Sequence, residues 1–183
     1  MPFEFPPSDV QPLVQEIAEI LISRNETIAV SEAACGGLMS SFLVSVPGAL
    51  RWFHGGTLVY SLNSRLKLSG WSEEDIKSYT GPSPKVALRS ARNLRFELGA
   101  TYALSETGFA SRSKDLTNDY GEQDVGTVYI GLTGPNGDQV ITFHTGIEER
   151  CENMRIFATK GLEFLLKVLK EAENSTTDNE SDE

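Results

Sequence analysis

A short polar segment, Ser31 to Gly37, follows a β-branched apolar run and opens a predicted helix. Amides beside glycines at a helix start attract phosphate or an oxyanion, so Gly36 and Gly37 could form an anion site, or could be needed only sterically. Cys35 would lie near the positive end of the helix dipole, where the pKa of a thiol falls, unless it is a small buried residue that packs like alanine. Glu32 could bind a sugar, act as a base or cap the helix.

Two further polar segments end predicted strands. Tyr60 and Ser61 close one strand, with Arg65 just after them, and Thr107 and Gly108 close another. Each has a structural alternative, because a strand tyrosine is often a core residue with its hydroxyl bonded, and Thr-Gly can be a plain turn. Ligands of open α/β sheets bind beyond the carboxyl ends of the strands. We therefore expect the three segments to meet at one edge of a sheet.

The elements that position these segments are predicted from hydrophobic periodicity and turn signals. Helices are expected at about 8–24, 38–46, 84–98 and 149–170, with another short helix capped by 72–75, and strands at 27–30, 57–61, 102–104, 126–132 and 139–144. This order indicates an α/β sandwich with a mixed, partly parallel sheet. We interpret 1–8 as a leader, 9–170 as one domain, 171–183 as a disordered acidic tail and the polar stretch 111–124 as a functional or mobile loop.

The charge and the cysteines exclude several classes of function. The chain has 16 basic and 26 acidic residues and a net charge of −10, which disfavours nucleic acid and anionic membranes as partners. Cys35 and Cys151 lie far apart, with neither a disulfide framework nor metal-ligand spacing. No apolar run reaches the roughly 18 residues of a membrane span, and the start lacks a secretion signal. We expect a cytoplasmic protein with no metal and no cofactor.

Together the polar segments resemble the C-terminal domain of the CinA family, the nicotinamide mononucleotide deamidases. The family's AESCTGG loop is matched by SEAACGG at 31–37, its G(G)xxxYS strand end by GGTLVYS at 55–61, its TGxAGP loop by TGFA at 107–110, and its PVGTV strand by VGTV at 125–128. Order and spacing agree over about 10–169. The resemblance implies a three-layer α/β/α sandwich, a homo-oligomer, and hydrolysis of the carboxamide of nicotinamide mononucleotide (NMN) to nicotinate mononucleotide and ammonia.

This chain departs from the family pattern at the positions of the family's catalytic residues. The family's serine nucleophile aligns with Ala33, whose methyl group cannot attack an amide. The family lysine aligns with Arg65, which keeps the charge but cannot act as a general base near neutral pH. The basic residue of the last helix that faces the phosphate in the family is best matched by Arg155. Whether this chain is an active enzyme therefore stays open.

The first hypothesis is an amidase of this family with a relocated nucleophile, in which Cys35 attacks the carboxamide, the Gly36 and Gly37 amides hold the oxyanion, and Tyr60 positions the substrate or transfers a proton. The alternative is a catalytically impaired module that binds an NMN-like nucleotide. A third is an oligomeric interaction protein. The predicted catalytic residues are Cys35 and Tyr60, and the predicted ligand-binding residues are Glu32, Gly36, Gly37, Ser61, Arg65, Thr107, Gly108, Gly126, Thr127 and Arg155.

Overall fold

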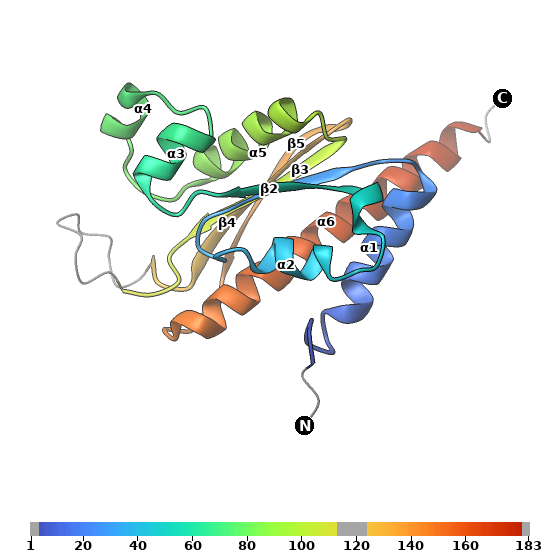
Figure 1. The fold of residues 1–183 in the computed structure, drawn as a ribbon, viewed down its shortest axis with the longest axis horizontal. Helices are drawn as coiled ribbons and strands as arrows, with labels where there is room; N and C mark the ends of the chain where they lie inside the picture. Colours follow the sequence, from blue (N-terminus) through green and yellow to red (C-terminus); the bar gives the residue numbers. More distant parts are fainter. Residues whose placement is uncertain (1–3, 113–123, 181–183) are drawn as a thin grey trace.

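One mixed sheet organises the chain, of which the computed structural model describes residues 4–112 and 124–180 (Figure 1). The strand order is β2-β1-β3-β4-β5, with β1 parallel to β2 and β3, and with β3, β4 and β5 successively antiparallel. The strands are β1 (Ile28–Glu32), β2 (Phe53–Leu58), β3 (Tyr102–Gly108), β4 (Thr127–Gly134) and β5 (Gly137–His144). The predicted α/β class and the mixed, partly parallel sheet are confirmed.

Helices cover both faces of this sheet (Figure 1). One face carries α1 (Gln11–Ser23), α2 (Leu38–Val44) and α6 (Arg150–Glu180), and the other carries α3 (Leu62–Leu68), α4 (Glu73–Lys77) and α5 (Pro84–Leu98), while a short 3-10 turn, η1 (Ala49–Arg51), follows α2. The main core is apolar and fully buried, with Ile17, Phe42, Leu104 and Phe157 among its members. None of the helices in the described part of the chain is long and apolar enough to span a membrane.

Some element boundaries differ from the prediction. β2 starts at Phe53 and ends at Leu58, so that Tyr60 and Ser61 follow the strand rather than close it. Gly55 and Gly56, which precede the predicted strand, lie within β2. Position 56 requires a glycine because a Cβ there would be only 1.9 Å from the Val30 carbonyl oxygen. Helix α6 continues to Glu180, past its predicted end at 170 and into the acidic tail. Most of the predicted 111–124 loop lies outside the described residues.

Candidate functional site

The Glu32 side chain caps helix α2. Its Oε2 accepts hydrogen bonds from the amides of Gly37 (3.0 Å) and Met39 (3.1 Å), and its Oε1 accepts from the Ser40 amide (2.8 Å) and the Ser40 hydroxyl (2.6 Å). Gly36 and Gly37 have φ of 66° and 99°, a backbone conformation that favours glycine. The capping alternative for Glu32 is thus the one the geometry supports, and the Gly37 amide is already bonded.

Glu106 is a site residue that the sequence reasoning missed. Its Oε1 accepts hydrogen bonds from the amides of Ala33 (2.6 Å) and Cys35 (2.8 Å). Its Oε2 is buried and has no hydrogen-bond partner among the described residues. Burial raises the pKa of this carboxyl to about 7, with the charge of Glu32 acting in the same direction and the two amide bonds acting against it. A buried carboxylate therefore holds the loop that would carry the chemistry.

Cys35 lies in the core and not at an exposed site edge. Its side chain is fully buried among the apolar residues of the main cluster. Burial raises the pKa of the thiol well above its usual value, and the charges of Glu106 and Glu32 raise it further. Of the two interpretations of Cys35, the structure supports the small buried residue and not the thiol of lowered pKa, because these effects outweigh the dipole of α2, a helix of only 7 residues. A thiolate at Cys35 is thereby disfavoured near neutral pH.

Arg65 and Thr107 are two predicted site residues that the structure brings together. Arg65 is buried, and its Nη2 donates a hydrogen bond of 3.1 Å to Thr107 Oγ1. The guanidinium carbon lies 5.4 Å from the ring centroid of Trp71 and 5.4 Å from that of Tyr79. No carboxylate in the described part of the chain forms an ion pair with it. Arg65 is thus a buried cation whose charge these contacts leave uncompensated.

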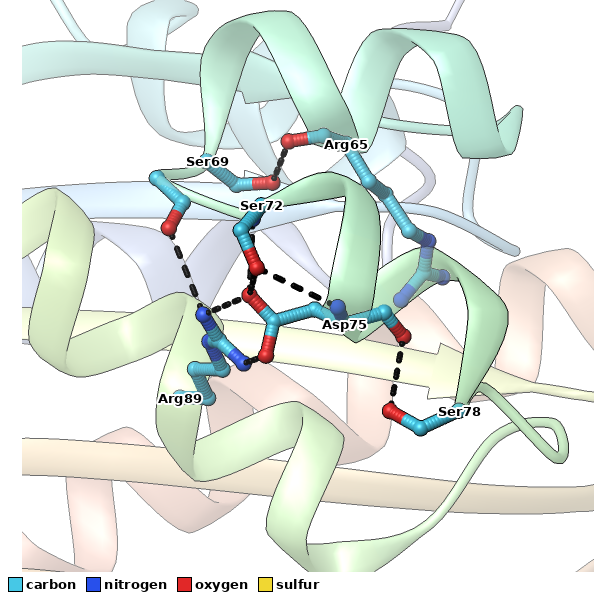
Figure 2. Close-up of polar contacts among 7 residues, drawn as sticks. Arg65, Ser69, Ser72, Asp75, Ser78 and Arg89 are labelled. Carbon is cyan, nitrogen blue, oxygen red and sulfur yellow. Dashed lines mark hydrogen bonds and ion pairs between the residues drawn. The ribbon is translucent and has the colours of Figure 1, made fainter.

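A second arginine supports the same stack from the other helices of this face. Figure 2 shows Asp75 held between Ser72 and Arg89, with Arg89 Nη2 2.6 Å from Asp75 Oδ2. The Arg89 guanidinium lies 5.3 Å from the Trp71 ring centroid. Hydrogen bonding to Arg89 and to Ser72 holds the pKa of Asp75 well below its usual range. Arg89 contacts the same ring as Arg65, but its charge is paired.

Tyr60 is exposed and contacts the start of α6. The Arg150 Nη2 donates to Tyr60 Oη at 3.0 Å, the Arg150 Nη1 donates to Ser111 Oγ at 2.9 Å, and the guanidinium carbon lies 5.7 Å from the tyrosine ring centroid. Tyr60 is 61% exposed, which excludes the core alternative. By contrast, Arg155 is paired with Asp9 (3.1 Å) and Glu152 (2.8 Å). The basic residue of α6 beside a predicted site residue is therefore Arg150, not Arg155.

The remaining predicted ligand residues have local structural partners. Ser61 caps α3, since its hydroxyl accepts from the Ser64 amide at 3.1 Å. A Cβ at Gly108 would be 2.5 Å from the Thr127 carbonyl oxygen, so this glycine permits the close approach of β3 and β4. Gly126 has φ of 85°, and Thr127 Oγ1 lies 3.0 Å from His144 Nδ1. In the described part of the chain, no group of three or more His, Cys, Asp and Glu residues is placed to hold a metal ion.

The predicted site is divided by the sheet itself. Successive side chains of a strand point to opposite faces. The Ser105 hydroxyl donates to the Ala87 carbonyl of α5, so Ser105 and Thr107 face the side that carries α3 and α5. Glu106 lies between them in β3 and faces the side of α2 and Cys35. The predicted nucleophile and the buried cation Arg65 therefore belong to different faces.

The fold and these strand-end polar residues define a three-layer α/β protein. Comparison with known sequences shows to which family of such proteins the chain belongs. The profile of the CinA C-terminal domain matches residues 10–169, so the chain belongs to the CinA family. A CinA-like protein of Desulfosudis oleivorans is 32% identical over 86% of this chain and 37% of that protein. A CinA-like protein of Trichormus variabilis is 35% identical over 72% of this chain and 30% of that protein. The chain thus spans about a third of the length of these relatives.

Solved structures agree on the fold. The competence/damage inducible protein CihA from Agrobacterium tumefaciens has a TM-score of 0.78 at 22% identity, over 92% of this chain and 99% of that one. A CinA superfamily protein from Klebsiella pneumoniae has a TM-score of 0.77 at 15% identity, over 88% of this chain and 98% of that one. At this level of identity the likeness concerns the fold alone.

Proposed function

We propose that this chain is a nucleotide-binding member of the CinA family that binds an NMN-like ligand and does not hydrolyse its carboxamide. The family supplies the ligand class, because the resemblance at 31–37, 55–61 and 107–110 is to NMN deamidases. The geometry supports binding over hydrolysis. The binding part rests on Arg65, and the lack of hydrolysis rests on Ala33, Cys35 and Glu106.

The buried guanidinium of Arg65 is the observation that carries the proposal. A buried charge is costly unless it is paired, and paired arginines are the rule in protein interiors. This chain has 26 acidic residues against 16 basic ones, yet Arg65 contacts a hydroxyl and two aromatic rings in place of a carboxylate. An anionic ligand would supply the missing charge, and a guanidinium fits the oxygens of a phosphate well. Arg65 and Thr107 are therefore proposed to bind the phosphate of the nucleotide.

The loop at 31–37 lacks groups that amide hydrolysis needs. Ala33 has no nucleophilic atom, and the Cys35 thiol is buried with a raised pKa. The amides of Ala33, Cys35 and Gly37 already donate to Glu106 and Glu32, so that of the two amides predicted to hold the tetrahedral oxyanion, those of Gly36 and Gly37, the second is occupied. Without a nucleophile, several orders of magnitude of rate are lost.

The test measures NMN binding by calorimetry and ammonia release from NMN with the same purified protein. We expect binding with ammonia release no higher than in a protein-free blank. Cys35→Ala serves as the comparison and should bind NMN as the wild type does. Ammonia release by the wild type that Cys35→Ala abolishes would overturn the proposal and establish an amidase with a relocated nucleophile.

A further inference from the structure

Two buried carboxylates on neighbouring strands accept amides of one segment of the chain. Ser31-Glu32 ends β1, whereas Ser105-Glu106 lies within β3, which ends at Gly108; Ser31 is in register with Ser105, so Glu32 and Glu106 come next on adjacent strands. Glu106 accepts from the amides of residues 33 and 35, and Glu32 from those of residues 37, 39 and 40. Glu106 thus satisfies amides of the segment that joins β1 to α2, and Glu32 satisfies the amide of Gly37 and those of the first turn of α2.

These amide bonds compensate for the burial of both carboxylates. Glu32 is 1% exposed and Glu106 is 2% exposed, and in the described part of the chain neither forms an ion pair with a basic side chain. A carboxylate in such surroundings depends on hydrogen bonds to its charged form. For Glu106, the two amide donors are at Ala33 and Cys35, beside the position of the family's serine.

We propose that Glu106 is an internal anion of this loop: its carboxylate takes the Ala33 and Cys35 amides and so excludes the oxyanion of a tetrahedral intermediate. Glu106 is thus a positioning residue that acts through the loop. This inference rests on the proposed function, binding without hydrolysis, and adds an obstacle to the two already described, the missing serine and the arginine at the position of the family lysine. A serine placed at position 33 would find the amides of residues 33 and 35 occupied by Glu106.

The obstacle is electrostatic as well as geometric. In hydrolysis by a serine, the hydroxyl oxygen bonds to the carboxamide carbon, its proton passes to the leaving nitrogen, and the carbonyl electron pair moves onto oxygen. Ammonia then departs, and water releases the acid and regenerates the serine. The negative oxygen of the intermediate would have to displace a carboxylate oxygen that lies 2.6 and 2.8 Å from the two amide nitrogens. The ionised form of Glu106, which predominates above its pKa of about 7, would repel an oxyanion strongly at that separation in a buried site.

The activity test compares Ala33→Ser with two double variants. Glu106→Gln keeps a side-chain oxygen that can accept from both amides, whereas Glu106→Ala removes the acceptor. We expect ammonia release from NMN by the Ala33→Ser protein to stay at the level of a protein-free blank, and release by Ala33→Ser/Glu106→Ala to exceed that level at least about 100-fold, the size of effect that one oxyanion donor supplies. The Ala33→Ser/Glu106→Gln protein should stay close to the single variant. Equal activity of the single variant and the Glu106→Ala double variant would overturn the proposal.

A spectroscopic test keeps the proposal falsifiable where the double variants are inactive or do not fold. In protein labelled with ¹⁵N at Ala and Cys, the Ala33 and Cys35 amide protons should shift together with a midpoint near the Glu106 pKa of about 7, and this titration should vanish in Glu106→Gln. Glu32 and Cys35 are the other titratable groups acting on Glu106. In Glu32→Gln and Cys35→Ala the amide protons should therefore still titrate, with a midpoint above the pKa of an ordinary carboxyl, because burial is the largest cause of the raised pKa. Amides that do not titrate in the wild type would overturn the inference. Ammonia release by the wild type would instead contradict the proposed function.

Discussion

Glu106 and Arg65 are both buried, but different contacts offset the cost of their burial. Glu106 receives two backbone amides, whereas Arg65 receives one hydroxyl and the faces of two aromatic rings. A carboxylate can be satisfied by amides in this way, because hydrogen bonds to the charged form lower its free energy. Rings and a hydroxyl leave more of the guanidinium charge uncompensated. At the scale of the residue, two amides offset part of the cost of burying Glu106, whose pKa is still raised, whereas Arg65 has no bonded anion among the described residues and is proposed to bind one from a ligand.

Replacing Glu106 by glutamine should change how stability depends on pH. The folded pKa of about 7 exceeds the model-compound value of 4.5, so between these values the folded protein retains a proton that the unfolded chain releases. The free energy of unfolding of the wild type, relative to Glu106→Gln, should therefore fall as pH rises through this window, by at most about 3 kcal/mol. Urea unfolding at several pH values from about 5 to 8 measures it. A difference that is constant with pH would contradict the assignment.

Arg65→Met should weaken NMN binding at least about tenfold, because a desolvated charge pair with the phosphate is lost. Arg89→Met is the matched control, since Arg89 contacts the same Trp71 ring but pairs with Asp75. We expect this control to keep its NMN affinity and to lose only a modest amount of stability. Calorimetry with both variants, each checked for native circular dichroism, gives the comparison. Equal loss of affinity in both would show that the stack matters and the Arg65 charge does not.

At the scale of the element, α2 is too short to be stable by itself and depends on its start. It has 7 residues, its preceding residue Gly37 has a left-handed backbone, and Glu32 supplies the cap. Isolated helices of fewer than about 12 residues are marginal in water. The end of β1 therefore fixes where α2 begins and how the segment before it is folded.

Glu32→Gln should destabilise the protein by about 3 kcal/mol. In the wild type the backbone N–H groups at the start of α2 donate to both oxygens of a buried carboxylate, whereas the variant would place a side-chain NH₂, itself a donor, in the position of one of these oxygens. Ser83→Ala is the control at another helix start, where one hydroxyl accepts from the Val86 amide at 3.3 Å. Its cost should be about 1 kcal/mol. Chemical denaturation of the two variants beside the wild type measures both. Similar losses in both would contradict a special role of Glu32.

Periodicity and turn signals predicted the strands and the mixed sheet, because buried strands and amphipathic helices leave strong local patterns, but they missed the short helix α3, which carries Arg65. The start of β2 was predicted too late, because Gly56 is needed for the close approach of Val30 in the neighbouring strand, a contact that the local sequence does not show. Glu106 was missed because a single acid after a strand has no local signature. The repeat of Ser-Glu after two apolar strands was the available signal, but it gains meaning only when the strands are known to be neighbours.

At the scale of the whole molecule, apolar side chains remain on the surface of the face that carries α2. Val44 is 59% exposed and Leu50 is 92% exposed, and the elements that carry them, α2 and η1, contact each other. Exposed apolar groups of this kind are typical of protein interfaces. We propose that the homo-oligomer implied by the resemblance to the CinA family assembles through α2 and η1.

Leu50→Glu should therefore lower the mass in solution toward that of one chain, 20.1 kDa. Phe96→Glu is the control, because Phe96 is 85% exposed but lies on α5, on the opposite face of the sheet. We expect this control to keep the mass of the wild type. Light scattering coupled to size-exclusion chromatography makes the measurement. A loss of assembly only in Phe96→Glu would move the interface to α5, and a wild type of 20.1 kDa would exclude the homo-oligomer.

The central claim, binding of an NMN-like nucleotide without hydrolysis, is tested most directly by titrating NMN into the wild-type protein in a calorimeter. Binding gives heat pulses that return to the baseline and diminish to saturation, whereas turnover gives a sustained heat signal after each injection. We predict saturable pulses with no sustained signal, and their loss in Arg65→Met. A sustained signal would show an active amidase, and no heat beyond dilution, at several temperatures, would show that this chain does not bind NMN.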